Sequence, residues 1–365
     1  MQSEISVIMV PHHEIDLDTL AADWLTLEKQ GNRSFFLTWA WIGNWLKTFT
    51  GKYYLLKATS DKQTVGLSII VKTKRKVFGF IPVEQWWLNR TGEQCFDQCW
   101  IEENDFLLAE AKQEQIRAAL LAFIKADNSW HELNVGMASR STLDSFSVVS
   151  AKHRVLLDDI GYAVNYADFN DSADDSYQQH VLSRNTRQKL RQSEKLLKQA
   201  GQLSFKVFST NDEKKQHLSQ IAQLHIQRWQ NTATPSGFVN QYFQQMLEKV
   251  IAQAEAEFLC LFLNDKPVAY LVNFIYQEKV YFYLSALAEL SNNKIKLGML
   301  LQQKAIEHYQ ALGLKQYDFL AGDARYKKSL TNHQYQQQMA CFYRSHLVLF
   351  CEQILRSAKE RFTQK

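Results

Sequence analysis

Proline is scarce in this chain, with 4 residues among 365, so a Pro-rich linker has little room and we expect the two halves of the chain to pack closely. No apolar run approaches the ~18 residues that a membrane helix needs, since even residues 268–276 are far fewer. Charge of one sign does not dominate. The 42 Lys and Arg residues exceed the 38 Asp and Glu residues slightly. This small positive excess suits an anionic ligand but is too small to indicate a DNA-binding protein.

Cysteine is also sparse, because the 5 residues are odd in number and scattered, and no basic-then-apolar signal segment precedes them. This pattern predicts a cytoplasmic protein. Only Cys95 and Cys99 lie close together, and no second pair has the spacing of zinc ligands, so no metal site is expected. The GxSxG, P-loop, HExxH and GxGxxG motifs are missing, which argues against serine hydrolases, Walker NTPases, zincins and simple Rossmann oxidoreductases.

The chain instead contains a repeated pattern, as its length suggests for two domains. Residues 53–71 and 258–276 each read as a β-hairpin with a polar turn. A further strand, an amphipathic helix (residues 110–126 and 298–312) and one more strand follow each hairpin. We therefore predict two α/β (α+β) units with mixed central sheets flanked by helices, at residues 1–165 and 170–345, followed by a helical tail at 346–365.

Residues 183–200 form a predicted helix with six basic residues and a single acid, Glu194. Arg184, Arg187 and Arg191 recur at i, i+3 and i+7 and so share one side. This side is either a solvated face or a basic wall for a phosphate-bearing ligand. Further along, Arg228 ends another predicted helix and is expected to face the cleft.

A second basic feature lies between the predicted strand 279–287 and the helix that begins at Gly298. The N-terminus of a helix offers unpaired N–H groups and a positive dipole, and Lys294 and Lys296 add charge, so this loop can hold a pyrophosphate. The matching loop of the first unit carries Glu102, Glu103, Asp105 and Glu110, which would repel it. We therefore expect a cofactor in the second unit only.

Polar side chains also follow the last strand of the second unit, where open α/β sheets bind ligands. Asp318 lies on this strand, and Asp323, Tyr326 and Lys327 follow it. Asp323 can accept a proton from an amine nucleophile or hold it by a salt bridge, and Tyr326 can protonate a leaving thiolate. A charged surface turn is the alternative interpretation.

These segments resemble the CelD-type acetyltransferases, a bacterial group of the GNAT superfamily that is associated with cellulose and exopolysaccharide gene clusters and related to Fem-type aminoacyltransferases. The resemblance covers nearly the whole chain. Its most specific parts are KLGMLLQQKAIEHYQALGLKQYDFLAGD (residues 296–323) and YKKSL (326–330). One departure is Ile295-Lys296-Leu297-Gly298, which stands where family members usually show a Ser-Pro-Gly turn.

The resemblance implies a tandem GNAT fold whose second copy binds acetyl-CoA or another acyl-CoA against a splayed strand at residues 281–287. A substrate amine would attack the thioester directly, with the strand backbone near Ser285 polarising the carbonyl. The implied catalytic residues are Asp323, Tyr326 and Ser285. The implied cofactor contacts are Leu284, Ser285, Ala286, Lys294, Lys296, Leu297, Gly298 and Met299. The proposed substrate contacts are Arg184, Arg187, Arg228, Asp318 and Lys327.

The sequence therefore predicts an acyl-CoA-dependent N-acyltransferase acting on an amino-sugar or amino-acid precursor for the cell envelope or an exopolysaccharide. One alternative is a Fem-like transferase that uses aminoacyl-tRNA, with the basic helix on the phosphates. No long heptad-patterned hairpin of the Fem type is present, which argues against it. Another alternative is a GNAT scaffold that binds a biosynthetic partner without catalysis. The oligomeric state is not predicted.

Overall fold

The computed structural model describes residues 4–31, 34–169, 176–232, 234–345, 349 and 351–352. The chain divides into two compact units: unit 1 comprises Met1–Asp158 and Gln337–Lys365, and unit 2 comprises Asp159–Gln336. Nearly all of the predicted tail at 346–365 lies outside the described residues. No described helix is long and apolar enough to cross a membrane.

Unit 1 is a mixed sheet in the order β1-β2-β3-β4-β6-β13, with β5 paired to β3. Its strands are β1 (Ile5–Pro11), β2 (Tyr53–Ser60), β3 (Gln63–Val77), β4 (Ile81–Leu88), β5 (Leu107–Leu108), β6 (Glu132–Ser139), the start of β7 (His153–Asn165) and most of β13 (His333–Tyr343). Its helices are η1 (His12–Glu14), α1 (Leu17–Glu28), η2 (Phe35–Leu37), α2 (Trp39–Thr48), α3 (Gln94–Asp97), α4 (Gln113–Ala126), α5 (Arg140–Ser145) and η3 (Phe146–Val148).

Unit 2 is a mixed sheet in the order β7-β12-β11-β10-β9-β8. Its further strands are β8 (Leu203–Phe208), β9 (Ala256–Leu263), β10 (Lys266–Tyr276), β11 (Lys279–Leu287) and β12 (Gln316–Ala321). Its helices are η4 (Tyr166–Asp168), α6 (Tyr177–His180), α7 (Arg184–Ala200), α8 (Asn211–Trp229), η5 (Gly237–Val239), α9 (Gln241–Gln253), α10 (Leu297–Ala311) and α11 (Arg325–Leu330).

The two units repeat one order of elements, as the sequence predicts. A strand, two helices and a three-stranded meander are followed by a helix and a strand parallel to the meander's last strand. Both predicted hairpins are present, and their two-residue turns have positive φ at both central positions, 51° and 65° at Asp61 and Lys62 and 51° and 60° at Asn264 and Asp265. These values define the type I′ turn, whose twist matches that of the strands.

Unit 1 is completed by a strand that comes from outside its first run of sequence, whereas unit 2 is one continuous run. Residues 161–165 of β7, which follow the first set of elements, pair with β12 in unit 2. Residues 337–343 of β13, which follow the second set, pair antiparallel with β6 in unit 1. The predicted domain 170–345 included this last segment, whereas its pairing groups it with unit 1.

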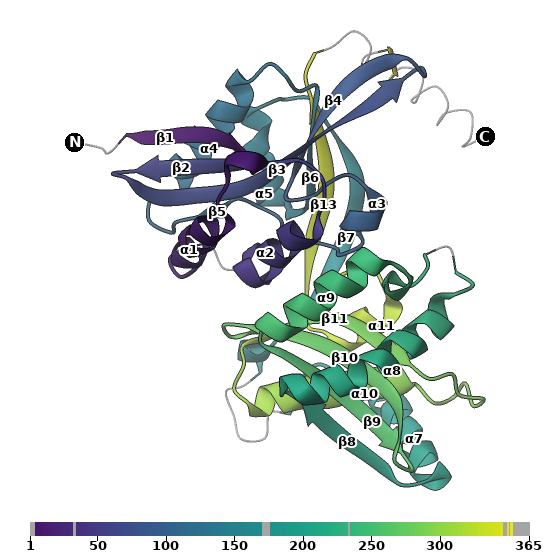
Figure 1. Cartoon of the computed structure of the whole chain (residues 1–365). Helices are drawn as coiled ribbons and strands as arrows, with labels where there is room; N and C mark the ends of the chain where they lie inside the picture. Colours follow the sequence, from purple (N-terminus) through teal and green to yellow (C-terminus); the bar gives the residue numbers. More distant parts are fainter. Residues whose placement is uncertain are drawn as a thin grey trace. The chain divides into compact units, whose positions relative to one another are not determined.

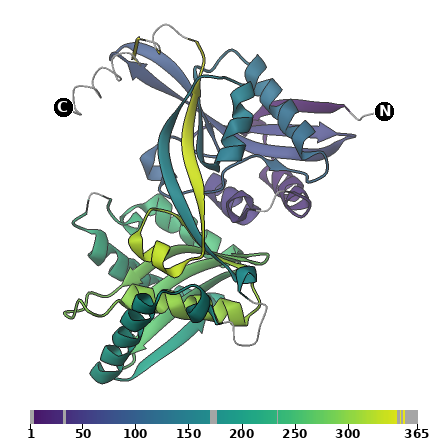
Figure 2. The ribbon, with the colours of Figure 1, turned by 180° about the vertical axis from the view of Figure 1, so that it is seen from behind.

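Helices cover both faces of each sheet. Figure 1 shows α8 and α9 on one face of the unit 2 sheet, and Figure 2, from behind, shows α7 and α10 on the other. The core under α7 and α10 contains Leu190 and Leu197 of α7 together with Leu301 and Ile306 of α10. Burial of such an apolar face provides most of the stability of a helix.

Candidate active site

Strands β11 and β12 pair over a short stretch and then separate. Their parallel pairing joins Lys279–Tyr281 to residues 316–318, whereas β11 continues to Leu287 paired with β10 alone. The register also shifts in the β10–β11 and the β7–β12 pairings near this point. Among the described residues of unit 2, the backbone of β11 beyond Tyr281 therefore has no strand partner on the β12 side. The segment that the resemblance identified as splayed has this geometry.

Leu284, Ser285 and Ala286 lie in this unpaired part of β11. The side chains of Leu284 and Ala286 are buried, and Ser285 is half-buried opposite Leu271 of β10. Only backbone groups and the Ser285 side chain are therefore available to a ligand from this stretch. The arrangement agrees with the backbone role that the resemblance implies.

A chain of aromatic rings lies where β11 and β12 part. The ring centroids of Phe282 and Phe319 are 5.8 Å apart, and those of Phe319 and Tyr326 are 6.2 Å apart. No described residue receives a hydrogen bond from the Tyr326 hydroxyl. Burial raises the pKa of Tyr326 to about 12, although the nearby charge of Arg228 lowers it slightly. Tyr326 therefore keeps its proton at neutral pH and can donate it.

The N-terminus of α10 lies against the end of β11. A Cβ atom built on Gly298 would come within 2.9 Å of Leu287 Cδ1, so the absence of a side chain permits this approach. The N–H groups of Leu297, Gly298 and Met299 find no acceptor among the described residues. The helix terminus thus presents three free donors and the positive end of its dipole beside the unpaired strand.

Positive side chains flank these donors. Lys294 and Lys296 are both exposed, and Lys296 folds back so that Nζ donates to the carbonyl oxygen of Asn293 at 2.8 Å. The backbone N–H of Lys296 donates a hydrogen bond to Ser193 Oγ of α7 at 2.9 Å. This bond fixes the basic helix α7 beside the start of α10, and Lys304 of α10 pairs with Glu194 of α7 at 3.3 Å. The donors and charges fit a phosphate group.

The two predicted arginines at the start of α7 have different environments. Arg187 is half-buried, and its Nη1 donates to the carbonyl oxygens of Gln178 and Leu182 at 2.9 and 2.6 Å. It therefore holds the loop before α7 and does not fit the expected substrate contact. Arg184 is exposed and remains available for a phosphate-bearing ligand.

Two other predicted substrate residues point inward. Asp318 is fully buried, and its carboxylate receives bonds from Tyr335 OH and Leu320 N at 2.7 Å and pairs with Lys279 Nζ at 2.8 Å. Lys327 is buried too, and its Nζ donates to two carbonyl oxygens at the end of β12, the shorter bond being 2.7 Å to Ala321. Both side chains hold the end of β12 in place, which does not fit direct contact with a substrate.

Asp323 has the exposure that a catalytic carboxylate needs. It lies between β12 and α11, is exposed, and accepts a hydrogen bond from Tyr162 OH at 2.8 Å. Its own backbone N–H donates to Asp159 Oδ1 at 3.0 Å. The bond to the Asp323 carboxylate raises the pKa of Tyr162, so Tyr162 remains the donor at neutral pH. One carboxylate oxygen of Asp323 is left for a substrate amine.

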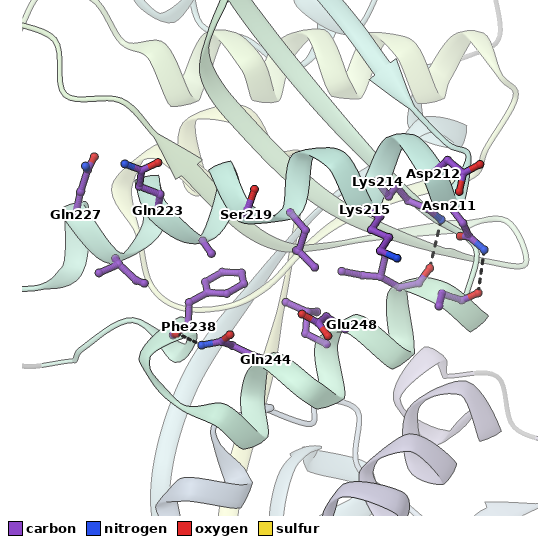
Figure 3. Close-up of a pocket in the computed structure, with 16 residues that line it drawn as sticks. Asn211, Asp212, Lys214, Lys215, Ser219, Gln223, Gln227, Phe238, Gln244 and Glu248 are labelled. Atoms are coloured by element: carbon purple, nitrogen blue, oxygen red, sulfur yellow. Dashed lines mark hydrogen bonds between the residues drawn. The ribbon is translucent and has the colours of Figure 1, made fainter.

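A groove with a volume of about 880 Å³ runs between α8 and α9. Figure 3 shows side chains from both helices pointing into it, with polar ones such as Gln223, Gln244 and Glu248 on its sides. Its apolar lining includes Leu218, Ala222, Ile226, Phe238, Leu247 and Ile251. A groove of this composition suits an elongated ligand with an apolar body. The sequence analysis did not predict this groove, although Leu218, Ala222 and Ile226 recur at i, i+4 and i+8 on α8.

His225 lies on α8 close to one end of this groove, in contact with its Phe238. Its Nδ1 is 2.7 Å from Ser236 Oγ, and its ring stacks on Trp229. Burial, together with the positive charge of Arg228, lowers the pKa of His225 to about 4. The folded protein therefore holds this imidazole neutral at pH values where the unfolded chain protonates it.

We expect this difference to make unit 2 less stable in mild acid. The stability that the neutral imidazole contributes is fully present above the unfolded pKa of about 6.5 and is lost as the pH falls toward 4. The loss amounts to about 2 kcal/mol at pH 5. Urea unfolding at about pH 7.5 and 5 should show that the wild type loses ~2 kcal/mol more than His225→Gln. Equal losses in the two proteins would mean that His225 is already protonated in the fold.

Unit 1 differs at the equivalent position, because a side chain fills the space beyond the paired part of β4 and β6. Asn104 is fully buried; its Nδ2 donates to Leu88 O at the end of β4, and its backbone N–H donates to Met137 O of β6, both at 2.8 Å. Asn89 Nδ2 in turn donates to Asn104 Oδ1 at 2.9 Å. Of the acidic residues in this loop, Asp105 forms an ion pair with Arg117. The polar network of Asn89 and Asn104 was not foreseen.

Known proteins support this description of the fold. A sequence model of the family described as an acetyltransferase (GNAT) domain matches residues 184–328. No curated protein matches the sequence. FemX has a similar solved structure, with 11% identity, a TM-score of 0.56 and coverage of 91% of this chain and 96% of FemX.

Another similar structure is the C-terminal domain (DUF2156) of a protein described as a lysylphosphatidylglycerol synthetase from Agrobacterium fabrum. It has 10% identity, a TM-score of 0.55 and coverage of 92% of this chain and 95% of that one. At such identities the likeness shows the fold alone. The residues that match the acetyltransferase (GNAT) model lie within unit 2, and the predicted fold of two repeated α/β units with mixed sheets is confirmed by the repeated order of elements. The matches do not distinguish the CelD-type group.

Proposed function

We propose that this protein transfers an acyl group from acyl-CoA to an amino group. The supporting observation is the unpaired stretch of β11 beside three free N–H groups at the start of α10, with Lys294 and Lys296 next to them. Free amides and ammonium groups suit a pyrophosphate, and the unpaired strand suits the amide-containing arm of coenzyme A. Calorimetric titration with acetyl-CoA and then longer acyl esters tests the proposal. Binding of none of them would overturn it.

In this proposal the thioester supplies an activated acyl group, and the residues of unit 2 handle the protons. The backbone of β11 near Ser285 donates to the carbonyl oxygen as negative charge develops there. Asp323 accepts the proton that the amine loses as the C–N bond forms. Tyr326 donates its proton to the sulfur as the C–S bond breaks, which its high pKa permits.

Removal of the Asp323 carboxylate should lower turnover without weakening cofactor binding. We expect Asp323→Ala to reduce kcat at least ~10-fold, because a positioned base contributes roughly 10²–10⁴-fold to such reactions. The dissociation constant for acetyl-CoA should not change, since Asp323 lies at the end of β12 rather than at the start of α10. Release of free thiol in the presence of a panel of amino sugars measures kcat, and calorimetry measures binding.

Asp323→Asn is the matched control, because its side-chain oxygen can still accept the bond from Tyr162 but it has no basicity. If Asp323 acts as the base, both variants lose activity. If Asn retains activity, Asp323 only positions Tyr162. Unchanged turnover in both variants would remove Asp323 from the mechanism.

For the acceptor we propose an amino-sugar or amino-acid precursor for the cell envelope or an exopolysaccharide, in the cytoplasm. The support is the CelD-type resemblance of residues 296–323 and 326–330. Arg184 and Arg228 are exposed and suit a phosphate or carboxylate on such an acceptor. An acceptor screen with phosphorylated and unphosphorylated amino sugars tests this part separately from acyl-CoA binding.

The basic surface of α7 favours one alternative, transfer from an aminoacyl-tRNA. Lys189, Arg191, Lys195 and Lys198 are exposed on this helix as well as Arg184. Binding to tRNA that weakens steeply with salt, combined with no binding of acyl-CoA, would favour this alternative. Binding of neither ligand would favour a scaffold without catalysis.

A further inference from the structure

The β3–β4 hairpin of unit 1 extends beyond the rest of its sheet. Pairing of β3 with β2 ends at Val71, and residues 72–77 of β3 pair only with β4. Strand β6 contacts β4 only at residues 85–87. The outer part of the hairpin is therefore a two-stranded ribbon, which projects from the sheet in Figure 1.

Two aromatic side chains stand exposed at the tip of this ribbon. The connecting turn is Phe78-Gly79-Phe80, and the exposed fractions of Phe78 and Phe80 are 47% and 74%. Phe78 also adopts a φ of 52°, in a region that a bulky residue rarely occupies. Asn or Gly would adopt this positive φ with the least conformational strain. Because Phe is strained and exposed here, it does not serve only to form the turn.

The ribbon beside the tip is positively charged. Residues 72–83 contain Lys72, Lys74, Arg75 and Lys76 and no acidic residue. Lys76 is exposed and forms no ion pair with a described residue. Lys74 is also exposed, and its Nζ forms an ion pair with Glu84 Oε1 at 2.7 Å. Lys76 and Lys74 therefore lie in the second and fourth residue pairs behind the aromatic tip.

The ribbon is also held rigidly. Arg75 forms ion pairs with the buried Glu132 at 2.7 Å and with Glu352 at 2.6 Å. On one face, Val77 and Val83 pack with Leu349 in a small buried cluster. The projection of the tip is therefore fixed before any partner binds, which lowers the entropic cost of binding.

We propose that this tip is a docking element for an anionic phospholipid bilayer. Phe78 and Phe80 would enter the interfacial region, where aromatic side chains are favoured, while Lys74 and Lys76 contact the headgroups. A convex tip of three residues cannot bury the ~800 Å² that each partner contributes to a typical stable protein interface. A fluid bilayer, by contrast, adapts to a convex apolar tip, and its negative charge complements the lysines.

Co-sedimentation with vesicles tests the proposal on the full chain. One set of vesicles is phosphatidylcholine alone, and the other mixes phosphatidylcholine and phosphatidylglycerol in equal parts. We expect binding to the mixed vesicles that falls at least ~10-fold in Phe78→Asn/Phe80→Ser, because the buried rings supply most of the attraction. Lys74→Gln/Lys76→Gln should weaken binding several-fold and reduce its dependence on salt.

The controls distinguish specific binding by this tip from nonspecific hydrophobic adsorption and from misfolding of a variant. Leu312→Asn removes an exposed apolar side chain in unit 2, where Leu312 is 57% exposed, and should leave binding unchanged. Circular dichroism checks the fold of every variant, and Asn suits the positive φ at position 78. Absence of binding to mixed vesicles, or binding that the double Phe variant retains, would overturn the proposal. Self-association that depends on Phe78 and Phe80 without vesicle binding would show that a second copy is the partner.

Discussion

Gly298→Glu should abolish acyl-CoA binding. The variant places a carboxylate in the first turn of α10, beside the free N–H groups of Leu297, Gly298 and Met299 that we assign to the pyrophosphate. Repulsion between the carboxylate and the phosphates, and competition for the same donors, should raise the dissociation constant at least ~100-fold. Calorimetric titration with acetyl-CoA measures the effect.

Two variants separate charge from size. Gly298→Ala adds only a Cβ atom, 2.9 Å from the flexible end of Leu287, and should weaken binding much less. Ala311→Glu adds the same charge at the exposed last turn of α10, ~20 Å away along the helix, and should leave binding nearly unchanged. Tight binding by Gly298→Glu would mean that acyl-CoA does not use this helix terminus.

Asp318→Ala should strongly destabilise unit 2. It removes the acceptor of the Tyr335 hydroxyl and the Leu320 amide and leaves the Lys279 ammonium group without its counter-charge. Loss of one member of a buried ion pair costs about 3–5 kcal/mol. Native-state hydrogen exchange of the amides in β11 and β12 measures the loss.

Two further variants identify the cause. Asp318→Asn can still accept the two hydrogen bonds and should lose less stability. Lys279→Met combined with Asp318→Leu removes both charges and should recover part of the loss, because apolar residues can replace a buried pair. If Asp318→Ala instead leaves stability unchanged and raises only the KM for the acceptor, the substrate role inferred from sequence is correct and our structural one is wrong.

The sequence predicted secondary structure well wherever local chemistry determines it. Strand β11 begins and ends at the predicted residues, and the hairpin turns contain Asp61, Asn264 and Asp265, residue types that tolerate left-handed φ. The N-terminus of α7 is equally local, because the Ser183 side chain accepts a bond from the Thr186 amide. Patterns confined to a few residues thus carry enough information for these elements.

The direction of polar side chains was much harder to predict. Asp318, Asp323 and Lys327 all follow or end one strand, and this position made Asp323 a candidate catalytic residue and the other two candidates for substrate contact. Asp318 and Lys327 turn inward because the end of β12 has an irregular backbone, with Leu320 at a φ of 60°, and needs internal partners. That backbone shape depends on pairing with β7, which is distant in sequence.

The proposed contrast between the units rests on a different observation from the expected one. The sequence suggested repulsion by four carboxylates in the first unit, whereas Asp105 is paired with Arg117. The stronger argument for a cofactor-free unit 1 is that Asn104 fills the space beyond the β4–β6 pairing. An asparagine in a loop gives no sign in the sequence of such a role.

The late position of the last strand of unit 1 in the sequence has a consequence for protein synthesis. Strand β6 pairs with residues 337–343, which are synthesised late. Unit 1 therefore cannot complete its sheet when its first 158 residues leave the ribosome. The intervening residues 159–336 take roughly 10–35 s to translate at about 5–20 residues per second. During that interval an apolar strand edge is open to wrong partners. Nascent chains stalled in this interval should therefore bind chaperones, and release of the C-terminal strand should end that binding.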